Sequence, residues 1–278
     1  MTAHEITTSD GMRLAARWWS PRGDGVDGRA AVVVVHGFCG SKDEPAVELV
    51  ALRQVAAGRH VLTFDLRGHG RSEGETTLGL REGLDVDAAV ADARTVADTV
   101  VVVGSSMGGV ACIEHLAGTA EPGSGARASG AEVRRVAGAA GRADAGVLVA
   151  TPARWQVPRT ARGVLALALT QTRPGRAVAQ RHMGTRVAVR PGRGHEPTRR
   201  IGEVATPVAV IHGLDDRFVS PAAARSLHGA VPGPRLLDLV AGMGHGFCGP
   251  ATEPVDAAVD WALAQVAVSR FESGTTPA

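Results

Sequence analysis

The chain has 278 residues, of which 44% are hydrophobic and 21% charged, and its formal net charge is +2. A chain of this length and composition can bury a large core, so disulfide-stapled scaffolds, collagen-like fibres and fully disordered proteins are excluded. The three cysteines are few and odd in number, which indicates free thiols and a cytoplasmic protein.

The first half of the chain alternates apolar, β-branched runs with helix-like stretches, the pattern of βαβ units and a parallel sheet. An antiparallel hairpin is expected first, with strands at 5–8 and 12–19 around Asp10-Gly11. Buried strands are then predicted at 30–35, 60–65 and 99–103, and helices at about 44–57, 86–96 and 107–116. These elements predict an α/β protein.

The second half of the chain is less regular. Residues 118–141 are rich in Gly, Ala, Ser and Arg, and we expect a surface insertion there, with one helical turn near 132–136. Residues 152–200 interrupt the β-α alternation with a helical stretch of their own. Strands are predicted at 146–150, 208–211 and 236–240, and helices at 222–228 and 255–268. No apolar run approaches the roughly 18–20 residues of a membrane span, and the first residues lack the pattern of a secretory signal.

The motif that carries chemistry is Gly104-Ser105-Ser106-Met107-Gly108, which has the pattern G-x-S-x-G. It directly follows the strand at 99–103 and directly precedes a helix, the context in which this motif forms a nucleophile elbow. A serine on such a sharp turn projects its hydroxyl out of the sheet, and the free N–H groups at the helix start can stabilise an oxyanion. Ser105 supplies a second hydroxyl beside it, but the glycine spacing selects Ser106.

A serine hydroxyl needs a general base, and the base needs an acid that orients it. Asp216 and His245 each follow a predicted strand downstream, so the chain order is Ser, Asp, His. Because ligands bind beyond the carboxyl ends of parallel strands, we expect Ser106, Asp216 and His245 to converge there. The spacing Gly-x-x-Asp-x-x-Val favours Asp216 over its neighbour Asp215. In the alternative interpretation, His245 is a surface loop histidine and Asp216 is a turn former.

Together these residues resemble the α/β-hydrolase superfamily, most closely its serine-esterase and monoacylglycerol-lipase-like branch, and the resemblance covers nearly the whole chain. His36-Gly37-Phe38 directly follows the first buried strand, and residues 65–72 match the D-x-R-G-H-G-x-S loop of this family. The resemblance implies a mostly parallel central sheet flanked by helices, with an inserted cap. It also implies an oxyanion hole built from the backbone N–H groups of Phe38 and Met107. By the same resemblance, the 65–72 loop shapes the floor of the site, and His36 is structural.

The resemblance divides the chain into a catalytic domain, residues 1–151 and 201–278, and an inserted cap, residues 152–200. The cap holds 11 arginines and one acid, Glu196, a net charge of about +10, whereas the rest of the chain has about −8. Such an asymmetry can steer anionic substrates or dock the cap on an acidic surface. Alternatively, these are solvated arginines in an arginine-rich protein. The apolar stretch at 163–169 either lines an acyl pocket or packs on the main domain.

The resemblance implies a hydrolase that cleaves carboxylic esters of small molecules or acylglycerols, with Ser106 as nucleophile, His245 as general base and Asp216 as the orienting acid. Thioesterase, amidase or peptidase, acyltransferase and perhydrolase chemistry use the same triad and stay open, as does a non-catalytic binding protein. The sequence has no metal-ligand spacing, dinucleotide fingerprint or Walker motif, so we expect no cofactor and no metal. A near-neutral charge and 3% aromatic residues give no support for nucleic-acid binding, and the oligomeric state stays open.

Overall fold

The structure is a computed structural model that describes residues 1–21, 30–118, 141–154, 170–189 and 195–274. Within these ranges, eight strands form one sheet in the order β1-β2-β4-β3-β5-β6-β7-β8. In chain order the strands are β1 (Thr2–Thr7), β2 (Arg13–Trp19), β3 (Ala30–Val35), β4 (His60–Phe64), β5 (Thr99–Ser105), β6 (Ala145–Val149), β7 (Val208–Gly213) and β8 (Arg235–Val240).

The sheet is parallel except at its first two strands. β1 pairs with β2 in an antiparallel hairpin, and β2 pairs antiparallel with β4. All further pairs, from β4 across to β8, are parallel. The carboxyl ends of β3, β4, β5, β7 and β8 therefore share one edge of the sheet, and the loops that leave these strands can meet there.

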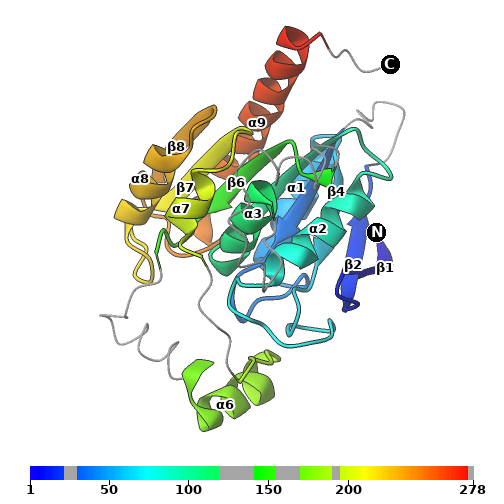
Figure 1. Ribbon diagram of the computed structural model, residues 1–278, viewed down its shortest axis with the longest axis vertical. Helices are drawn as coiled ribbons and strands as arrows, with labels where there is room; N and C mark the ends of the chain where they lie inside the picture. Colours follow the sequence, from blue (N-terminus) through cyan, green and yellow to red (C-terminus); the bar gives the residue numbers. More distant parts are fainter. Residues whose placement is uncertain (22–29, 119–140, 155–169, 190–194, 275–278) are drawn as a thin grey trace, which may run out of the picture.

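Helices cover both faces of the sheet (Figure 1). One face is covered by α1 (Pro45–Ala56) and α9 (Thr252–Glu272), and the other by α2 (Glu82–Ala93), α3 (Met107–Ala117), α7 (Pro197–Ile201) and α8 (Pro221–Ala230). A short 3-10 helix, η2 (Gly249–Ala251), precedes α9. α6 (Arg173–Met183) lies apart from the sheet (Figure 1).

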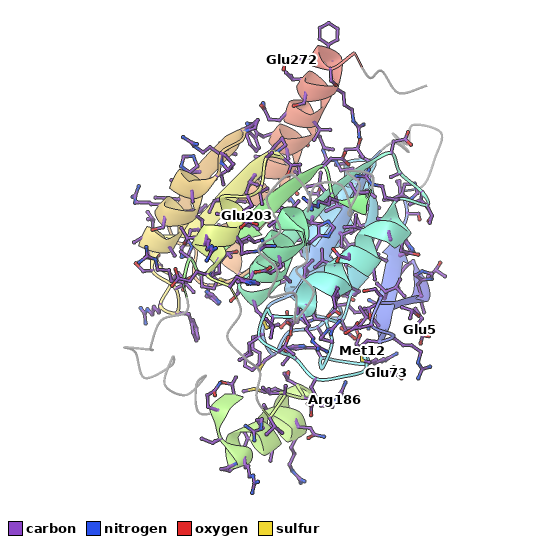
Figure 2. The ribbon with its side chains drawn as sticks, in the orientation of Figure 1. Glu5, Met12, Glu73, Arg186, Glu203 and Glu272 are labelled. Carbon is purple, nitrogen blue, oxygen red and sulfur yellow. The ribbon has the colours of Figure 1, made fainter. Side chains whose placement is uncertain are left out.

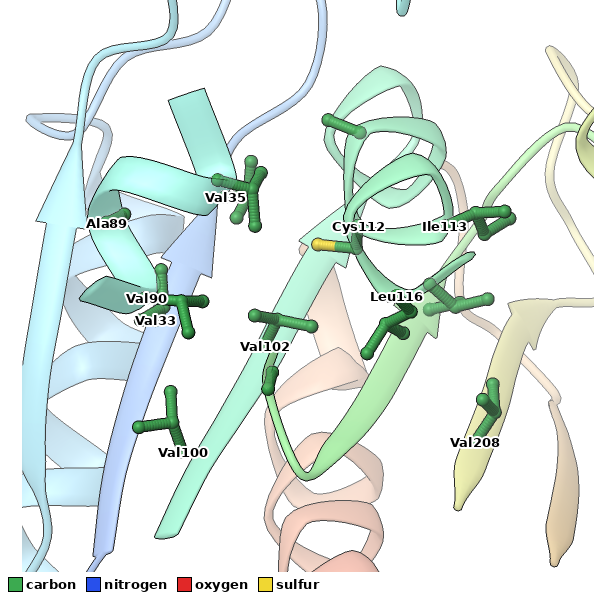
Figure 3. Packing of buried hydrophobic residues seen from close by; sticks show 14 of the residues in the cluster. Val33, Val35, Ala89, Val90, Val100, Val102, Cys112, Ile113, Leu116 and Val208 are labelled. Carbon is green, nitrogen blue, oxygen red and sulfur yellow. The ribbon is translucent and has the colours of Figure 1, made fainter. Parts of the chain in front are cut away.

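The period of two along the strands produces a separate core on each face. In β3, Val33 and Val35 belong to the core under α2 and α3, whereas Val32 and Val34 belong to the core under α1 and α9. All four side chains are fully buried. Figure 3 shows the first of these cores, where side chains of α2 and α3 face those of β3 and β5. A strand buried on both faces has no polar alternation, which is why the valine runs predicted a parallel sheet.

The α/β fold predicted from the sequence is confirmed, including the opening hairpin, and the elements differ mainly at their ends. The start of α2 shows why. The apolar pattern placed it at 86, but it begins at Glu82, whose buried carboxylate accepts hydrogen bonds from the Thr77 and Gly79 N–H groups. These hydrogen bonds fix the preceding loop to the first residue of α2, a contact that hydrophobic periodicity does not mark.

Some of the sequence predictions lie outside the described residues. These are residues 119–140 of the expected insertion, its helical turn near 132–136 and the apolar stretch at 163–169. In the ranges that the structure does describe, no helix combines the length and the apolar character needed to cross a membrane.

Candidate active site

The turn between β5 and α3 holds Ser106 in a backbone conformation that L-amino acids rarely adopt, with φ 53° and ψ −115°. Glycine is required two residues before and two residues after Ser106, because neighbouring atoms lie too close there for a side chain. A Cβ on Gly104 would lie 2.6 Å from Cys112 Sγ, and a Cβ on Gly108 would lie 2.4 Å from a backbone oxygen at the end of β3. The G-x-S-x-G spacing thus lets α3 start directly against the sheet, with Ser106 at the turn.

Three side chains from different loops form one hydrogen-bonded chain. His245 Nε2 lies 2.9 Å from Ser106 Oγ, and His245 Nδ1 lies 2.7 Å from Asp216 Oδ2. Ser106 follows β5, Asp216 follows β7 and His245 follows β8, so the parallel strand ends bring these residues together. The neighbouring candidates are placed differently: Asp215 is exposed, and Ser105 is the buried last residue of β5. Both distances suit transfer of a proton from the serine to the imidazole.

Asp216 has hydrogen-bonding neighbours at both carboxylate oxygens. Its Oδ1 accepts from the N–H groups of Phe218 and Val219, at 2.7 and 2.9 Å. Its Oδ2 accepts from His245 and lies 3.3 Å from Nε2 of His212, a fully buried residue of β7. Burial by itself would raise the pKa of Asp216, but the hydrogen bonds from His212, His245 and Val219 hold that pKa below its ordinary value. The anionic carboxylate can therefore keep a proton on His245 Nδ1.

The loop after β3 lies against Ser106. A Cβ on Gly37 would be 3.3 Å from Ser106 Cβ, a tight contact that would require its neighbour to shift by a few tenths of an ångström. In the part of the chain that is described, neither the Phe38 N–H nor the Met107 N–H donates a hydrogen bond to another protein group. Met107 is also the first residue of α3, where the helix dipole favours negative charge. Both groups are free to bind an oxygen of a ligand.

Two buried histidines fix the loop after β3 to the loop after β4. His36 Nδ1 donates to Gly37 O at 2.7 Å, and His36 Nε2 accepts from Leu66 N–H at 3.0 Å. His69 Nε2 accepts from Cys39 N–H at 3.3 Å, and the two imidazole rings lie 5.0 Å apart. Desolvation, with the neighbouring imidazole, lowers the pKa of His36 to about 3, and desolvation also lowers the pKa of His69. Neutral rings leave both Nε2 atoms free to accept these hydrogen bonds.

Lys42, the only lysine of the chain, adds an ion pair to the same junction. Its Nζ lies 3.3 Å from Asp65 Oδ2, and both side chains are buried. The Asp65 carboxylate also accepts from the Lys42 N–H at 2.7 Å and from the Arg71 N–H at 3.0 Å. The D-x-R-G-H-G-x-S loop therefore braces the loop that carries Phe38.

Residues 185–188, which follow α6, lie beside the loop after β4. Thr76 N–H donates to Arg186 O at 2.8 Å, and the Arg186 guanidinium donates to two carbonyls of the loop after β4. Thr185 forms a hydrogen bond with the Cys39 thiol, whose pKa is raised mainly by burial. Figure 2 shows Arg186 at the point where the α6 segment meets the rest of the molecule. The described part of the expected cap is thus anchored next to the loop that carries Phe38.

Two residues that contact the site were missed in the sequence. The Phe218 ring lies 5.1 Å from the His245 ring, and no sequence pattern pointed to it. His212 lies next to Asp216, and its only signal was a His-Gly pair at a strand end, the arrangement also seen at His36-Gly37. Among the described residues, no three His, Cys, Asp or Glu side chains are grouped so that they could hold a metal ion.

Comparison with known proteins gives four relevant likenesses. The family model described as "Alpha/beta hydrolase family" matches residues 32–261. A non-heme chloroperoxidase of Streptomyces lividans is 34% identical over 128 residues, which span 44% of this chain and only 42% of that protein. Among solved structures, the Pyrococcus furiosus esterase Pf2001 superposes with a TM-score of 0.65 at 22% identity, covering 94% of this chain and 88% of the esterase. The esterase RhEst1 of a Rhodococcus species gives a TM-score of 0.60 at 19% identity, covering 99% and 100%. At these identities, the structural likenesses show a shared fold.

Proposed function

Because the chain belongs to the alpha/beta hydrolase family, we propose that it is a serine hydrolase that cleaves carboxylic esters through Ser106, His245 and Asp216. The observation that carries the proposal is the hydrogen-bonded chain Ser106–His245–Asp216, with distances of 2.9 and 2.7 Å. A serine that only filled a turn would not need its strained backbone, a base at its hydroxyl and an anion behind that base. The esterases among the proteins of similar fold also favour an ester substrate.

In the first half of the proposed reaction, His245 Nε2 takes the proton from Ser106 Oγ as that oxygen attacks the acyl carbon. The carbonyl oxygen becomes an oxyanion, which accepts hydrogen bonds from the Phe38 and Met107 N–H groups. Asp216 stabilises the imidazolium through Nδ1. His245 then gives the proton to the leaving alcohol, and the acyl group stays on Ser106.

In the second half, water replaces the alcohol. His245 takes a proton from the water, whose oxygen attacks the acyl carbon, and the same N–H groups hold the second oxyanion. Return of the proton to Ser106 Oγ breaks the acyl–serine bond and releases the carboxylic acid. Every proton and electron pair of this cycle is carried by the substrate, water and the three side chains.

The proposal is tested by measuring hydrolysis of p-nitrophenyl esters from acetate to palmitate. The Ser106→Ala variant is expected to lower kcat by about 10⁴- to 10⁶-fold, as loss of a triad serine does elsewhere. Ser105→Ala is the matched control, because it removes the adjacent hydroxyl and is expected to keep activity of the same order as the parent. If Ser105→Ala were inactive and Ser106→Ala active, the nucleophile would be the wrong residue. If neither variant lost activity, the proposed chemistry would be wrong.

A second candidate function is favoured by the chloroperoxidase relative. If hydrogen peroxide attacked the acyl-enzyme instead of water, the products would be free Ser106 and a peracid. A peracid can oxidise chloride by transferring its terminal oxygen with the proton, giving hypochlorous acid and the carboxylate. Addition of peroxide and halide to the same ester assay tests this candidate, which predicts halogenation that is lost in Ser106→Ala; halogenation equal in both proteins would eliminate it.

A further inference from the structure

His212 is a fully buried histidine at the end of β7, four residues before Asp216. Its Nε2 lies 3.0 Å from Val219 O and 3.3 Å from Asp216 Oδ2. A carbonyl oxygen and a carboxylate oxygen can only accept a hydrogen bond, so the proton of this ring is on Nε2 and points at both. His212 is thus a second imidazole donor on the carboxylate that orients His245.

The other ring nitrogen, Nδ1, makes no polar contact, so the only hydrogen bonds of the described His212 side chain are those of Nε2. Among the described residues, its Nδ1 is buried and has no hydrogen-bond partner. A buried polar atom without a partner is unfavourable, and an apolar side chain would fill the same space without that penalty. The contacts of Nε2 therefore need to outweigh the cost of the unpaired Nδ1.

We propose that His212 is a positioning residue for the Ser106–His245–Asp216 triad, an inference that rests on the proposed function. Phe218 and Val219 hold Oδ1 of Asp216, while Oδ2 faces His245, the residue that changes charge during turnover. The Nε2–H of His212 holds Oδ2 while His245 exchanges its proton with Ser106. It also ties the Val219 carbonyl, at the far end of the turn, to the rigid strand β7. The His212 and His245 rings thus approach the same Asp216 oxygen, Oδ2, at 3.3 and 2.7 Å.

This placement predicts an effect on kcat and not on KM, because His212 is fully buried and does not reach the space that a substrate could occupy. We expect His212→Leu to lower kcat by about 10- to 100-fold, the size of effect that a small misplacement of a reacting group has, while KM changes little. His212→Gln can place an N–H where the imidazole Nε2–H lies, and it should restore most of the activity. His212→Asn reaches only the position of Nδ1 and should stay as slow as the leucine variant.

His115 provides the matched control. It is a second fully buried histidine, on α3, whose Nδ1 lies 2.5 Å from Asp87 Oδ1 and whose Nε2 accepts from Ala143 N–H. His115→Leu should lower the melting temperature without the loss in kcat. If the two leucine variants lost kcat equally for the same fall in melting temperature, His212 would have a structural role only and the proposal would be wrong. Parental kcat in His212→Asn would also overturn it, and this variant remains informative if His212→Leu does not fold.

A readout that needs no turnover separates this inference from the proposed function. The Nδ1 proton of His245, shared with Asp216, gives a far-downfield NMR resonance when the pair is well ordered. In the Ser106→Ala background, this resonance should be sharp when His212 is intact and in His212→Gln, and shifted or broadened in His212→Leu and His212→Asn. An unchanged resonance in all variants would refute the inference even if ester hydrolysis were established. Absence of serine-dependent hydrolysis, with the resonance behaving as expected, would refute only the proposed function.

Discussion

Ser106 has a φ of 53°, a conformation that costs an L-amino acid on the order of 1–3 kcal/mol. The surrounding contacts hold it there. Its N–H donates to Val149 O at 2.9 Å, and the close approach of Gly108 to the end of β3 leaves α3 no room to shift. The strain directs the hydroxyl toward His245. At the scale of single residues, the position of the Ser106 hydroxyl is therefore determined by the backbone conformation of the turn.

The buried histidine His36 makes the stability of the protein depend on pH. The unfolded chain binds a proton on His36 below the ordinary pKa of about 6.5, whereas burial keeps the folded protein from doing so until the pKa of about 3. The free energy of unfolding that depends on neutral His36 is therefore fully present above pH 6.5. It is lost as the pH falls from 6.5 toward 3, by about 1.4 kcal/mol per pH unit. We expect His36→Gln to be less stable at pH 7.5 but to lose less of its stability between pH 6.5 and 5.

Urea unfolding of the parent and of His36→Gln, at a series of pH values over this range, measures the two slopes. A parent slope equal to that of the variant would show that His36 takes up its proton equally in the folded and unfolded states. In that case folding would not keep the His36 ring neutral, and its Nε2 would not be held as the acceptor for the Leu66 N–H.

At the scale of elements, the same His-Gly pair occurs at the carboxyl ends of two strands, directly after β3 and as the last two residues of β7, and it acts in the same way at both. After β3, Gly37 lets the backbone approach Ser106; at the end of β7, a Cβ on Gly213 would lie 2.1 Å from Met243 O in the loop that carries His245. In each pair the histidine ring forms a hydrogen bond with a loop, His36 with the loop after β4 and His212 with the turn of Asp216. The glycine brings the loops together and the histidine fixes them.

The helix α6 concentrates positive charge just before the segment that contacts the loops after β3 and β4. Arg173, Arg176 and Arg181 are at least partly exposed on it, the helix contains no acid, and the segment that follows contacts the loop carrying Phe38. Because a localised charge raises the encounter rate of an oppositely charged ligand, the triple change of these residues to Glu should lower kcat/KM for an anionic ester, p-nitrophenyl hemisuccinate, by about 10-fold or more at low salt. The neutral p-nitrophenyl acetate should be unaffected.

The control for this charge reversal changes three arginines on α1, α8 and β8 to Glu: Arg53, Arg225 and Arg235. It alters the net charge equally but away from α6, so it should have a smaller effect on the anionic ester. An equal loss of kcat/KM on both esters, or an equal loss in the control variant, would show that α6 does not steer anionic substrates.

At the scale of the whole molecule, the sheet was predictable because its central strands, β3 to β7, are mostly apolar runs and its turns carry Gly, Asp and His at fixed spacings. The positions of Ser106, Asp216 and His245 follow from the same logic, since the ends of parallel strands meet at one edge. The division into a catalytic domain, 1–151 and 201–278, and a cap, 152–200, stays a prediction.

The contacts that sequence could not give are those between loops distant in the chain. The Cys39–His69 hydrogen bond and the anchoring of Arg186 on the loop after β4 depend on how loops pack, which no local pattern encodes. His212 was missed for the same reason, because a buried histidine in a strand is indistinguishable in sequence from any other core residue. These contacts position the predicted residues without sharing their motifs.

The central claim is that Ser106 is the nucleophile, and covalent labelling with a fluorophosphonate ester tests it most directly. Mass spectrometry of the intact protein and of its peptides should find one adduct, on Ser106, formed in proportion to the loss of ester hydrolysis. The Ser106→Ala variant should stay unlabelled, whereas Ser105→Ala should be labelled like the parent. An adduct on Ser105, or undiminished hydrolysis after complete labelling of Ser106, would contradict the claim.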